Sequence, residues 1–403
     1  MAEVAILTPQ SLLPSHRCAR VAAEVRMTVQ TVLIVDDDHN FGAALGDSLA
    51  GPGRDVIVCR DIESARMVLD NRLVTHIITD LRLSGSFGYE GLHIVETIRR
   101  NLSAIPVVVL SGYATEDIRR EAEARGATAV LQKPASVEQL ESFLGPSTGT
   151  IGAVTLVPTL DDVLDGGMLA SVFQPIVWND NPKYVVGFEA LTRLRTQSLF
   201  ADPELLFQYA QRKDRVVDLE LAAAASAIST GRELTRLGLL SINIHAAVFS
   251  QPDLFTDAVM SAAAEAGVPL RRIVLEITEQ APLPDVERVE ALTSMMRGAG
   301  LRFAFDDLGL AYSHLRAIAA VRPSYLKISQ HFGTDCESDD VKRKIVENID
   351  ALARSFSSEI VLEGIETAKT AAFARELGIR FGQGFYYSRP VNADILMSKY
   401  SAS

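Results

Sequence analysis

Short apolar runs alternate with longer amphipathic stretches along most of the chain, and they do so over two successive spans. In the first span, from Thr31 to about Leu144, five apolar runs are separated by stretches of helical period; they read "VLIV", "DVIVC", "HIIT", "PVVVL" and "AVLQ". Strands that alternate with helices form parallel sheets with helices on both faces. The pattern therefore predicts a doubly wound α/β domain with five strands.

The second span begins near Thr155 and repeats the strand-then-helix order. Its candidate strands are "VFQPIV", "YVVGFEAL", "LSINIH", "RIVLEI", "RFAFD", "YLKI", "EIVLEG" and a short one near "IRFGQGF". Eight such strands in about 250 residues match the size of a β/α barrel. The predicted fold class is therefore α/β: a doubly wound parallel sheet followed by a TIM-like β/α barrel.

Between the two spans the pattern is lost. The segment "GPSTGTIGA", Gly145 to Ala153, is rich in small and polar residues and has no periodicity, which indicates a linker. We expect a poorly ordered N-terminal extension over residues 1–29 and a first domain over 30–144. A linker over 145–154 and a barrel over 155–403 would follow.

Composition narrows the possible partners and location. The chain has 403 residues, 48% of them hydrophobic, which suits two folded domains. Its net charge of -12 argues against binding a nucleic-acid polymer, which needs a basic face. No apolar run approaches the roughly eighteen residues that cross a bilayer, so we expect no membrane insertion. Its three scattered cysteines suit a reducing compartment, and we expect a cytoplasmic protein.

Polar residues stand where the strands of the first domain end. They are Asp36, Asp37, Asp80, Ser111 and Lys133. Any one of them could be a cap or a turn residue, but in a doubly wound sheet all five would converge on one crevice. Three carboxylates there can hold Mg²⁺, while an ammonium and a hydroxyl can bind phosphate oxygens.

These residues lie in motifs of a known family. "VLIVDDD", "IITDLRLSG", "VVVLSGYAT" and "VLQKPAS" resemble a bacterial response-regulator receiver domain. The resemblance implies that Asp80 accepts a phosphoryl group from a partner sensor histidine kinase. It assigns Asp36, Asp37 and Asp80 to Mg²⁺, and Ser111 and Lys133 to the switch that reads the phosphate. Val130 stands where the family has its switch aromatic residue, so the coupling is expected to be weakened or replaced.

Acidic and amide side chains also follow the strands of the second domain. They include Glu189, Asn243, Glu276, Asp306, Asp307 and Glu363, with Lys327, Glu366 and Gln383 nearby. A single acid at a strand end is often only a helix N-cap. In a β/α barrel, however, the carboxyl ends of the strands open onto one face, and so many carboxylates cannot remain ionised together without cations.

The atom types of these candidate ligands indicate which metal ion the site would bind. Because oxygen ligands dominate and no His or Cys joins the set, Mg²⁺ or Mn²⁺ is favoured over zinc. The doublet of Asp306 and Asp307 indicates a two-metal centre, which activates water and supports an in-line phosphoryl displacement.

The same residues carry a second resemblance. "FQPIV", "GFEALTRL", "IVLEITE", "DDLG", "LKI", "VLEGIE" and "GQGF" resemble the EAL domain of cyclic di-GMP phosphodiesterases, from about Thr155 to the C-terminus. The family implies hydrolysis of cyclic di-GMP to linear pGpG, and a homodimer.

The resemblance also assigns roles to individual residues. The implied metal ligands are Glu189, Asn243, Glu276, Asp306, Asp307 and Glu363. Lys327 would position the attacking water, with Asp307 and Glu363 also in catalytic roles. The implied substrate-binding residues are Gln174, Arg193, Glu366 and Gln383. Glu279 would anchor the loop that follows the aspartate pair.

That loop departs from the family pattern. It reads "DDLGLAYSHL", in which Leu308, Leu310 and Ala311 replace the usual Phe, Thr and Gly, and Ser329 replaces an Asp two residues after Lys327. We therefore expect a weakened or conditionally active enzyme. Two functions stay open: a phosphodiesterase switched by phosphorylation, or a catalytically poor EAL module that acts as a cyclic di-GMP receptor or protein-interaction output. A cyclase has no supporting signature.

Overall fold

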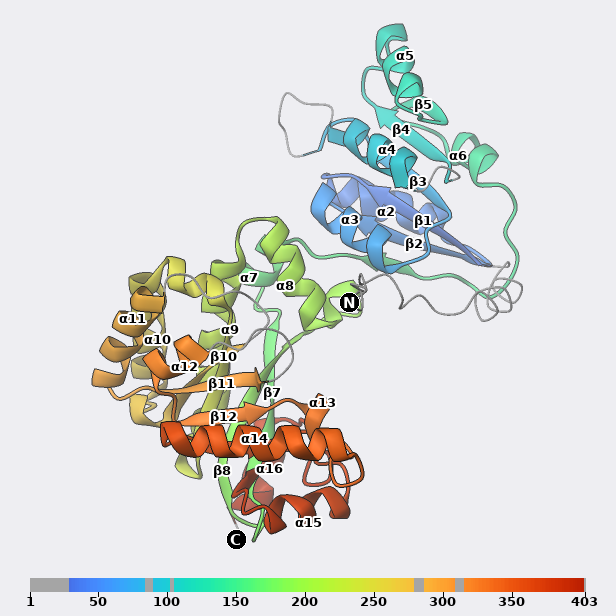
Figure 1. The fold of residues 1–403 in the computed structure, drawn as a ribbon. Coiled ribbons are helices and arrows are strands. Elements are labelled where there is room, and N and C mark those ends of the chain that lie inside the picture. The colour runs from blue at the N-terminus through green and yellow to red at the C-terminus, as the bar shows by residue number, and fades with distance from the viewer. Residues whose placement is uncertain (1–28, 84–89, 102–104, 279–285, 309–314, 402–403) are drawn as a thin grey trace, which may run out of the picture. The chain divides into compact units, whose positions relative to one another are not determined.

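The computed structural model describes residues 29–83, 90–101, 105–278, 286–308 and 315–401 (Figure 1). These residues divide into two compact units, whose main boundary along the chain lies between Thr159 and Leu160. The predicted N-terminal extension, apart from its last residue, lies outside the described residues.

The first unit is built on a six-stranded parallel sheet with the strand order β5-β4-β3-β1-β2-β6. Its strands are β1 (Gln30–Val35), β2 (Arg54–Cys59), β3 (His76–Asp80), β4 (Val107–Ser111), β5 (Ala129–Gln132) and β6 (Val154–Leu156). Its described helices are α2 (His39–Leu49), α3 (Ile62–Asn71), α4 (Glu90–Asn101), α5 (Glu116–Ala124) and α6 (Val137–Leu144). The doubly wound prediction is confirmed, because buried strands alternate with helices throughout.

The sixth strand was not predicted. β6 pairs in parallel with β2, where Val56 N–H donates to Ala153 O and Val157 N–H donates to Val58 O, both at 2.9 Å. The sequence had placed this segment at the junction of a linker and the barrel. A three-residue strand at a sheet edge has no apolar alternation of its own, so nothing in "GPSTGTIGAVTL" distinguished it from a linker.

A buried arginine forms hydrogen bonds that join this edge of the sheet to neighbouring elements. Arg54 is 3% exposed, and its guanidinium donates to Glu141 Oε2 in α6 at 3.1 Å. The same group donates to Gly145 O at 2.8 Å, Leu49 O at 3.3 Å and Gln30 Oε1 at 2.8 Å. One side chain thereby links β1, β2, the end of α2 and the chain that leaves α6.

The second unit is a closed eight-stranded barrel with the order β10-β11-β12-β13-β14-β7-β8-β9. Its strands are β7 (Leu169–Trp178), β8 (Val185–Leu194), β9 (Leu239–Ile244), β10 (Ile273–Thr278), β11 (Arg302–Leu308), β12 (Tyr325–Ile328), β13 (Glu359–Leu362) and β14 (Phe381–Gly382). The TIM-like barrel is confirmed, with one difference from an all-parallel barrel. β7 runs antiparallel to both of its neighbours, because the short connection between β7 and β8 is too brief to hold a crossover helix.

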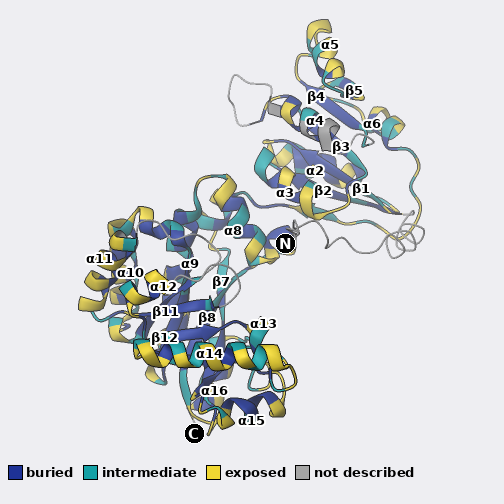
Figure 2. Cartoon of the chain, viewed as in Figure 1, coloured by how far each residue is buried: buried dark blue, intermediate teal, exposed yellow. Residues whose placement is uncertain are grey.

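Helices surround the barrel strands, which Figure 2 shows as mostly buried. The described helical elements after Thr159 are α7 (Leu160–Asp165), η1 (Leu199–Ala201), α8 (Pro203–Arg212), α9 (Val216–Gly231), η2 (Arg232–Arg236), η3 (Ala246–Ser250), α10 (Pro252–Ala266), η4 (Leu270–Arg272), α11 (Val286–Gly298), α12 (Leu315–Val321), α13 (Gln330–Gly333), α14 (Asp340–Phe356), α15 (Ala368–Glu376) and α16 (Ala393–Tyr400). Large aromatic side chains such as Phe173, Phe188, Phe303 and Phe305 form the core between strands and helices.

Candidate active site

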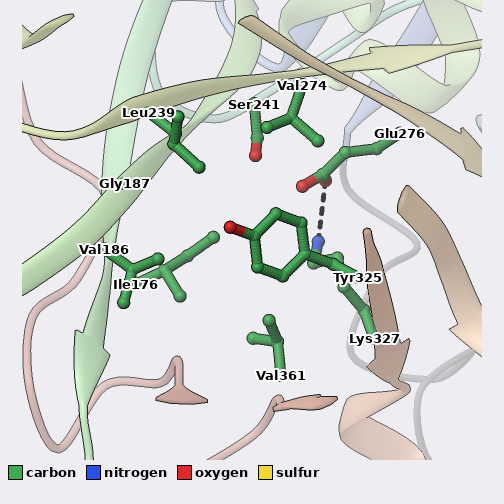
Figure 3. Close-up of a pocket in the computed structure, with 10 residues that line it drawn as sticks. All are labelled: Ile176, Val186, Gly187, Leu239, Ser241, Val274, Glu276, Tyr325, Lys327 and Val361. Atoms are coloured by element: carbon green, nitrogen blue, oxygen red, sulfur yellow. Dashed lines mark hydrogen bonds and ion pairs between the residues drawn. The ribbon is translucent and has the colours of Figure 1, made fainter. Parts of the chain in front are cut away.

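Side chains on the barrel strands alternate between the barrel interior and the surrounding helices. Glu276 and Lys327 point inward and line a small chamber together with Val274 and Tyr325, which lie two positions earlier on the same strands (Figure 3). The apolar members of each pair lie toward the amino ends of β10 and β12, and the charged members lie toward the carboxyl ends. Alternation in the sequence therefore produces a charged layer at the carboxyl end of the barrel.

Lys327 is the centre of this charged layer. Its side chain is 1% exposed, and its Nζ lies 2.8 Å from Glu363 Oε1 and 2.9 Å from Glu276 Oε2. The same Nζ lies 3.1 Å from Asp306 Oδ2 and 3.2 Å from Glu189 Oε2. Residues far apart in the sequence are thus joined at one ammonium, which we call the Lys327 cage.

The carboxylates of the Lys327 cage exceed the charge that one ammonium can balance. Burial, against the opposing effect of Lys327, raises the pKa of Glu276 to about 8 and that of Asp306 to about 6. Glu189 is equally buried, but Lys327 and the side-chain amides of Gln383 and Asn243 outweigh burial and lower its pKa. Carboxylates that cannot all ionise together form a site that divalent cations would stabilise.

Two overlapping sets of carboxylates have the spacing of metal ligands. Oxygens of Glu189, Glu276 and Asp306 lie within 4.8 Å of one another, and so do oxygens of Asp306, Asp307 and Glu363. Asp306 belongs to both sets, so two ions bound there would share a ligand.

Two buried amide oxygens support this interpretation. Asn243 donates its Nδ2 to Glu189 Oε1 at 2.8 Å, and Gln383 donates its Nε2 to Glu189 Oε2 at 2.6 Å. Within the described part of the chain, Asn243 Oδ1 and Gln383 Oε1 have no hydrogen-bond partner. A buried oxygen without a partner is costly, and a cation beside it would remove that cost. The donor set, composed of oxygens, fits Mg²⁺ or Mn²⁺.

The backbone at the aspartate pair explains how two successive residues reach one site. Pairing between β11 and β12 shifts register between Phe305 and Leu308, and Asp307 has a φ of 57°. In a regular strand, Asp306 and Asp307 would face opposite sides of the sheet. The bulge instead re-aims the second side chain, as bulges beside active sites commonly do.

The predicted substrate-binding residues fall into two cavities. A cleft of about 240 Å³ is lined by Gln174, Glu366 and Gln383 together with carboxylates of the Lys327 cage. Gln174 accepts a hydrogen bond from Gln383 at 3.1 Å and donates to Ser388 O at 3.1 Å. Arg193 lies instead in a larger cavity of about 550 Å³, which shares Leu191 with the cleft and also contains Asn243.

One residue of that larger cavity was not singled out from the sequence. Glu220 in α9 is 4% exposed and accepts the backbone N–H of His245 at 3.0 Å. Burial, against this hydrogen bond, raises the pKa of Glu220 to about 8. The signal in the sequence was a lone acid within the largely apolar helical stretch "LELAAAASAI".

Two sequence predictions cannot be placed. Glu279, the expected loop anchor, and the altered loop residues Leu310 and Ala311 lie outside the described residues. Leu308 is described and is buried at the end of β11. Ser329 is also buried, and its hydroxyl accepts the N–H of His331 as the N-cap of α13.

The first unit brings its predicted residues together at the carboxyl ends of its strands. Oxygens of Asp36, Asp37 and Asp80 lie within 4.8 Å of one another. Lys133 Nζ lies 2.6 Å from Asp36 Oδ2 and 3.2 Å from Asp80 Oδ2. Burial raises the pKa of both Asp36 and Asp80, although Lys133 opposes it. This acidic cluster fits a divalent cation beside Asp80.

Ser111 lies at the end of β4, next to this cluster in the sheet. Its hydroxyl donates to Tyr113 O at 3.0 Å and accepts the N–H of Tyr113 at 3.1 Å. Val130, at the expected aromatic position, is buried in β5. The Ser111 hydroxyl is thus engaged with the chain that follows it.

Comparison with known families identifies both domains. A model described as the EAL domain matches residues 159–390, and the response regulator receiver domain matches residues 32–144. The chain belongs to the EAL domain family. Its EAL domain is preceded by a receiver domain, as the two sets of strand-end motifs had indicated.

Individual relatives carry related descriptions. The chain is 33% identical over 129 residues to the cyclic di-GMP phosphodiesterase PdeL of Escherichia coli, which is 32% of this chain and 36% of PdeL. It is 28% identical over 249 residues to the cyclic di-GMP phosphodiesterase RocR of Pseudomonas aeruginosa, covering 59% of this chain and 62% of RocR. The matched part thus falls well short of the full length of these relatives.

A solved structure extends the comparison to three dimensions. The "PaMucR Phosphodiesterase, c-di-GMP complex" superposes with a TM-score of 0.54 and 26% identity, over 59% of this chain and 97% of that one. Two of the matching relatives are thus described as cyclic di-GMP phosphodiesterases, and this similar structure is a complex with cyclic di-GMP. Separately, no helix in the described ranges has the length and apolar character needed to cross a membrane.

Proposed function

We propose that the chain is a phosphorylation-regulated phosphodiesterase whose EAL domain hydrolyses cyclic di-GMP to linear pGpG. The observation that supports this most is the Lys327 cage. Its buried carboxylates and unpartnered amide oxygens stand at the carboxyl end of a β/α barrel, where such barrels carry their catalytic groups.

The residues divide into two proposed metal sites. Glu189, Asn243, Glu276 and Asp306 would hold one divalent cation, and Asp306, Asp307 and Glu363 would hold a second, either Mg²⁺ or Mn²⁺. Such a pair of ions, when bound, supplies Lewis-acid stabilisation of an in-line displacement at phosphorus.

The chain's own residues supply orientation and charge balance. Lys327, held among four carboxylates, would fix their directions and orient the attacking water. Asp307 and Glu363, which line the open cleft, would accept a proton from that water. Gln174, Glu366 and Gln383 would bind the dinucleotide in the cleft.

A receptor is the second candidate. Ser329, where the family has an Asp, offers only a hydroxyl that already caps α13, and the altered loop follows directly after Asp307. Loss of residues that support metal ligands commonly costs about ten- to a hundredfold in affinity or activity. On this alternative the EAL domain would bind cyclic di-GMP and signal by conformation or through a protein partner.

One experiment separates the candidates. The purified full chain is incubated with cyclic di-GMP and Mg²⁺ or Mn²⁺, and pGpG is measured beside ligand affinity. We expect turnover that Glu189→Ala or Asp306→Asn lowers by at least about a hundredfold, since each removes a proposed ligand. Glu376→Gln, an exposed acid at the end of α15, is the control. Tight binding without any product would support the receptor instead.

A further inference from the structure

A further cavity lies at the opposite end of the barrel from the Lys327 cage. It measures about 420 Å³, and its lining includes Val185, Leu239, Arg302, Tyr325 and Phe381. These are the first residues of β8, β9, β11, β12 and β14. Because the catalytic carboxylates lie toward the other ends of the same parallel strands, this amino-end cavity is separate from the proposed active site.

Three arginines line the amino-end cavity. Arg271 and Arg272 directly precede β10, and Arg302 opens β11. Within the described ranges none of the three has an ion-pair partner, and Arg271 and Arg302 are exposed. Three unneutralised guanidinium groups at one cavity are unexpected in a chain with a net charge of -12. They create a local positive field that would attract an anion.

Aromatic and aliphatic residues form the rest of the cavity lining. Trp178 and Phe381 meet edge to face with ring centroids 5.0 Å apart, and Tyr325 and Phe381 meet at 6.2 Å. Tyr325 also lines the small interior chamber below the Lys327 cage, beside Leu239 and Val186 (Figure 3). The floor of the cavity is therefore apolar and aromatic, while its rim is basic.

We propose that the amino-end cavity binds a small aromatic phosphate ester of the nucleoside monophosphate class. Guanidinium groups match phosphate oxygens in fork geometry, and aromatic side chains offer surfaces on which a base can pack. The volume falls within the range of small-molecule pockets. A simple inorganic anion would leave the aromatic floor unused, and an uncharged aromatic compound would leave the arginines unused.

The only tryptophan of the chain is Trp178, so its fluorescence reports directly on this cavity. Adenosine 5′-monophosphate is titrated into the full chain, with excitation at wavelengths where the nucleotide does not absorb, and binding is checked by calorimetry. We expect a saturable change in Trp178 emission. The double variant Arg271→Ala/Arg302→Ala should weaken binding by at least about tenfold, since each arginine supplies a charge-assisted hydrogen bond.

Matched controls make the result decisive. Arg66→Ala removes an exposed arginine of α3 in the other unit and should leave binding unchanged. Asp306→Asn should also leave nucleotide binding at this cavity unchanged, because Asp306 lies in the proposed active site at the other end of the barrel. Should the double variant fold poorly, Arg302→Glu reverses one charge and should abolish the fluorescence response.

Adenosine and inorganic phosphate test the two halves of the ligand separately. We expect each to bind at least about tenfold more weakly than the monophosphate ester. Equal affinity for either half would overturn the proposal, and so would unchanged binding by the double variant.

Discussion

At the scale of single residues, Lys327 is a buried cation within ion-pair distance of four carboxylates. Its ammonium is buried among four carboxylates, and their attraction, set against burial, holds its pKa well above the ordinary value. Removing one partner of a buried charge network leaves uncompensated charges, which typically costs about 3–5 kcal/mol. The side chain therefore contributes to stability as well as to the proposed chemistry.

We predict that Lys327→Ala lowers the free energy of unfolding by about 3–5 kcal/mol in the presence of a chelator. Added Mg²⁺ or Mn²⁺ should restore part of that loss, because cations bound to the folded cage stabilise it by mass action. Urea unfolding followed by Trp178 fluorescence measures both effects. Lys344→Ala, an exposed lysine of α14, is the control. Equal stability of Lys327→Ala and its parent would contradict this account of the cage.

Glu220 gives a prediction about pH. Burial raises its pKa in the folded barrel to about 8, above the value near 4.5 expected when unfolded. The folded state therefore holds the proton more tightly, so this contribution to stability is complete below about pH 4.5 and is lost as pH rises toward 8. The loss should be on the order of a few kcal/mol.

Glu220→Gln should remove this dependence while it keeps an acceptor for the His245 N–H. We expect the thermal midpoint of the variant to exceed that of the parent at about pH 8, and the difference to shrink toward pH 5. Thermal unfolding of both proteins across this range provides the measurement, with Glu204→Gln at the exposed edge of the same cavity as control. A constant difference at every pH would argue against a titrating Glu220.

At the scale of elements, apolar runs predicted most strands correctly because each buried strand carries its own pattern. β6 and the antiparallel direction of β7 were missed for a shared reason. Both are set by what lies beside the segment, an open sheet edge for β6 and a short connection for β7, and neither leaves a local signal. The bulge at Asp307 was also hidden, although it decides where the second aspartate points.

A substitution at Arg54 tests what holds the edge strand β6 to the sheet. We predict that Arg54→Leu raises hydrogen exchange in β2, β6 and the chain following α6, because the carbonyls of Leu49 and Gly145 lose their donor. Glu141→Gln should have a smaller effect, since that side chain is 41% exposed and the neutral amide still accepts a hydrogen bond. Exchange measured by mass spectrometry on the full chain compares the two. Unchanged protection from hydrogen exchange in Arg54→Leu would show that the hydrogen bonds of Arg54 do not stabilise β6.

At the scale of the whole molecule, two strand-end sites share one chain. Parallel strands carry their carboxyl ends to a common edge or face, so the predicted carboxylates of each site lie close together, while their roles stay predictions. The sequence did not reveal the amino-end cavity, whose arginines and aromatic residues stand before or at the start of strands, apart from Trp178 at the end of the antiparallel β7. Of the predicted substrate-binding residues, Gln174 lines the cleft and Arg193 lines the adjoining cavity, and their roles stay predictions.

The last prediction concerns the link between the two sites. We expect a small-molecule phosphoryl donor with Mg²⁺ to phosphorylate Asp80, and Asp80→Asn to block this modification. Phosphate at Asp80 adds charge beside Lys133, which now pairs with both Asp36 and Asp80, so these contacts must rearrange.

Allosteric couplings typically change an equilibrium by roughly 5- to 150-fold. With Val130 in place of an aromatic switch residue, we expect a change near fivefold in phosphodiesterase rate, in dimer formation, or in both. Rates of pGpG formation and sedimentation are compared for phosphorylated and unmodified protein, with Asp47→Asn on the exposed face of α2 as control. Identical rates and identical sedimentation would mean that the receiver domain does not regulate this EAL domain.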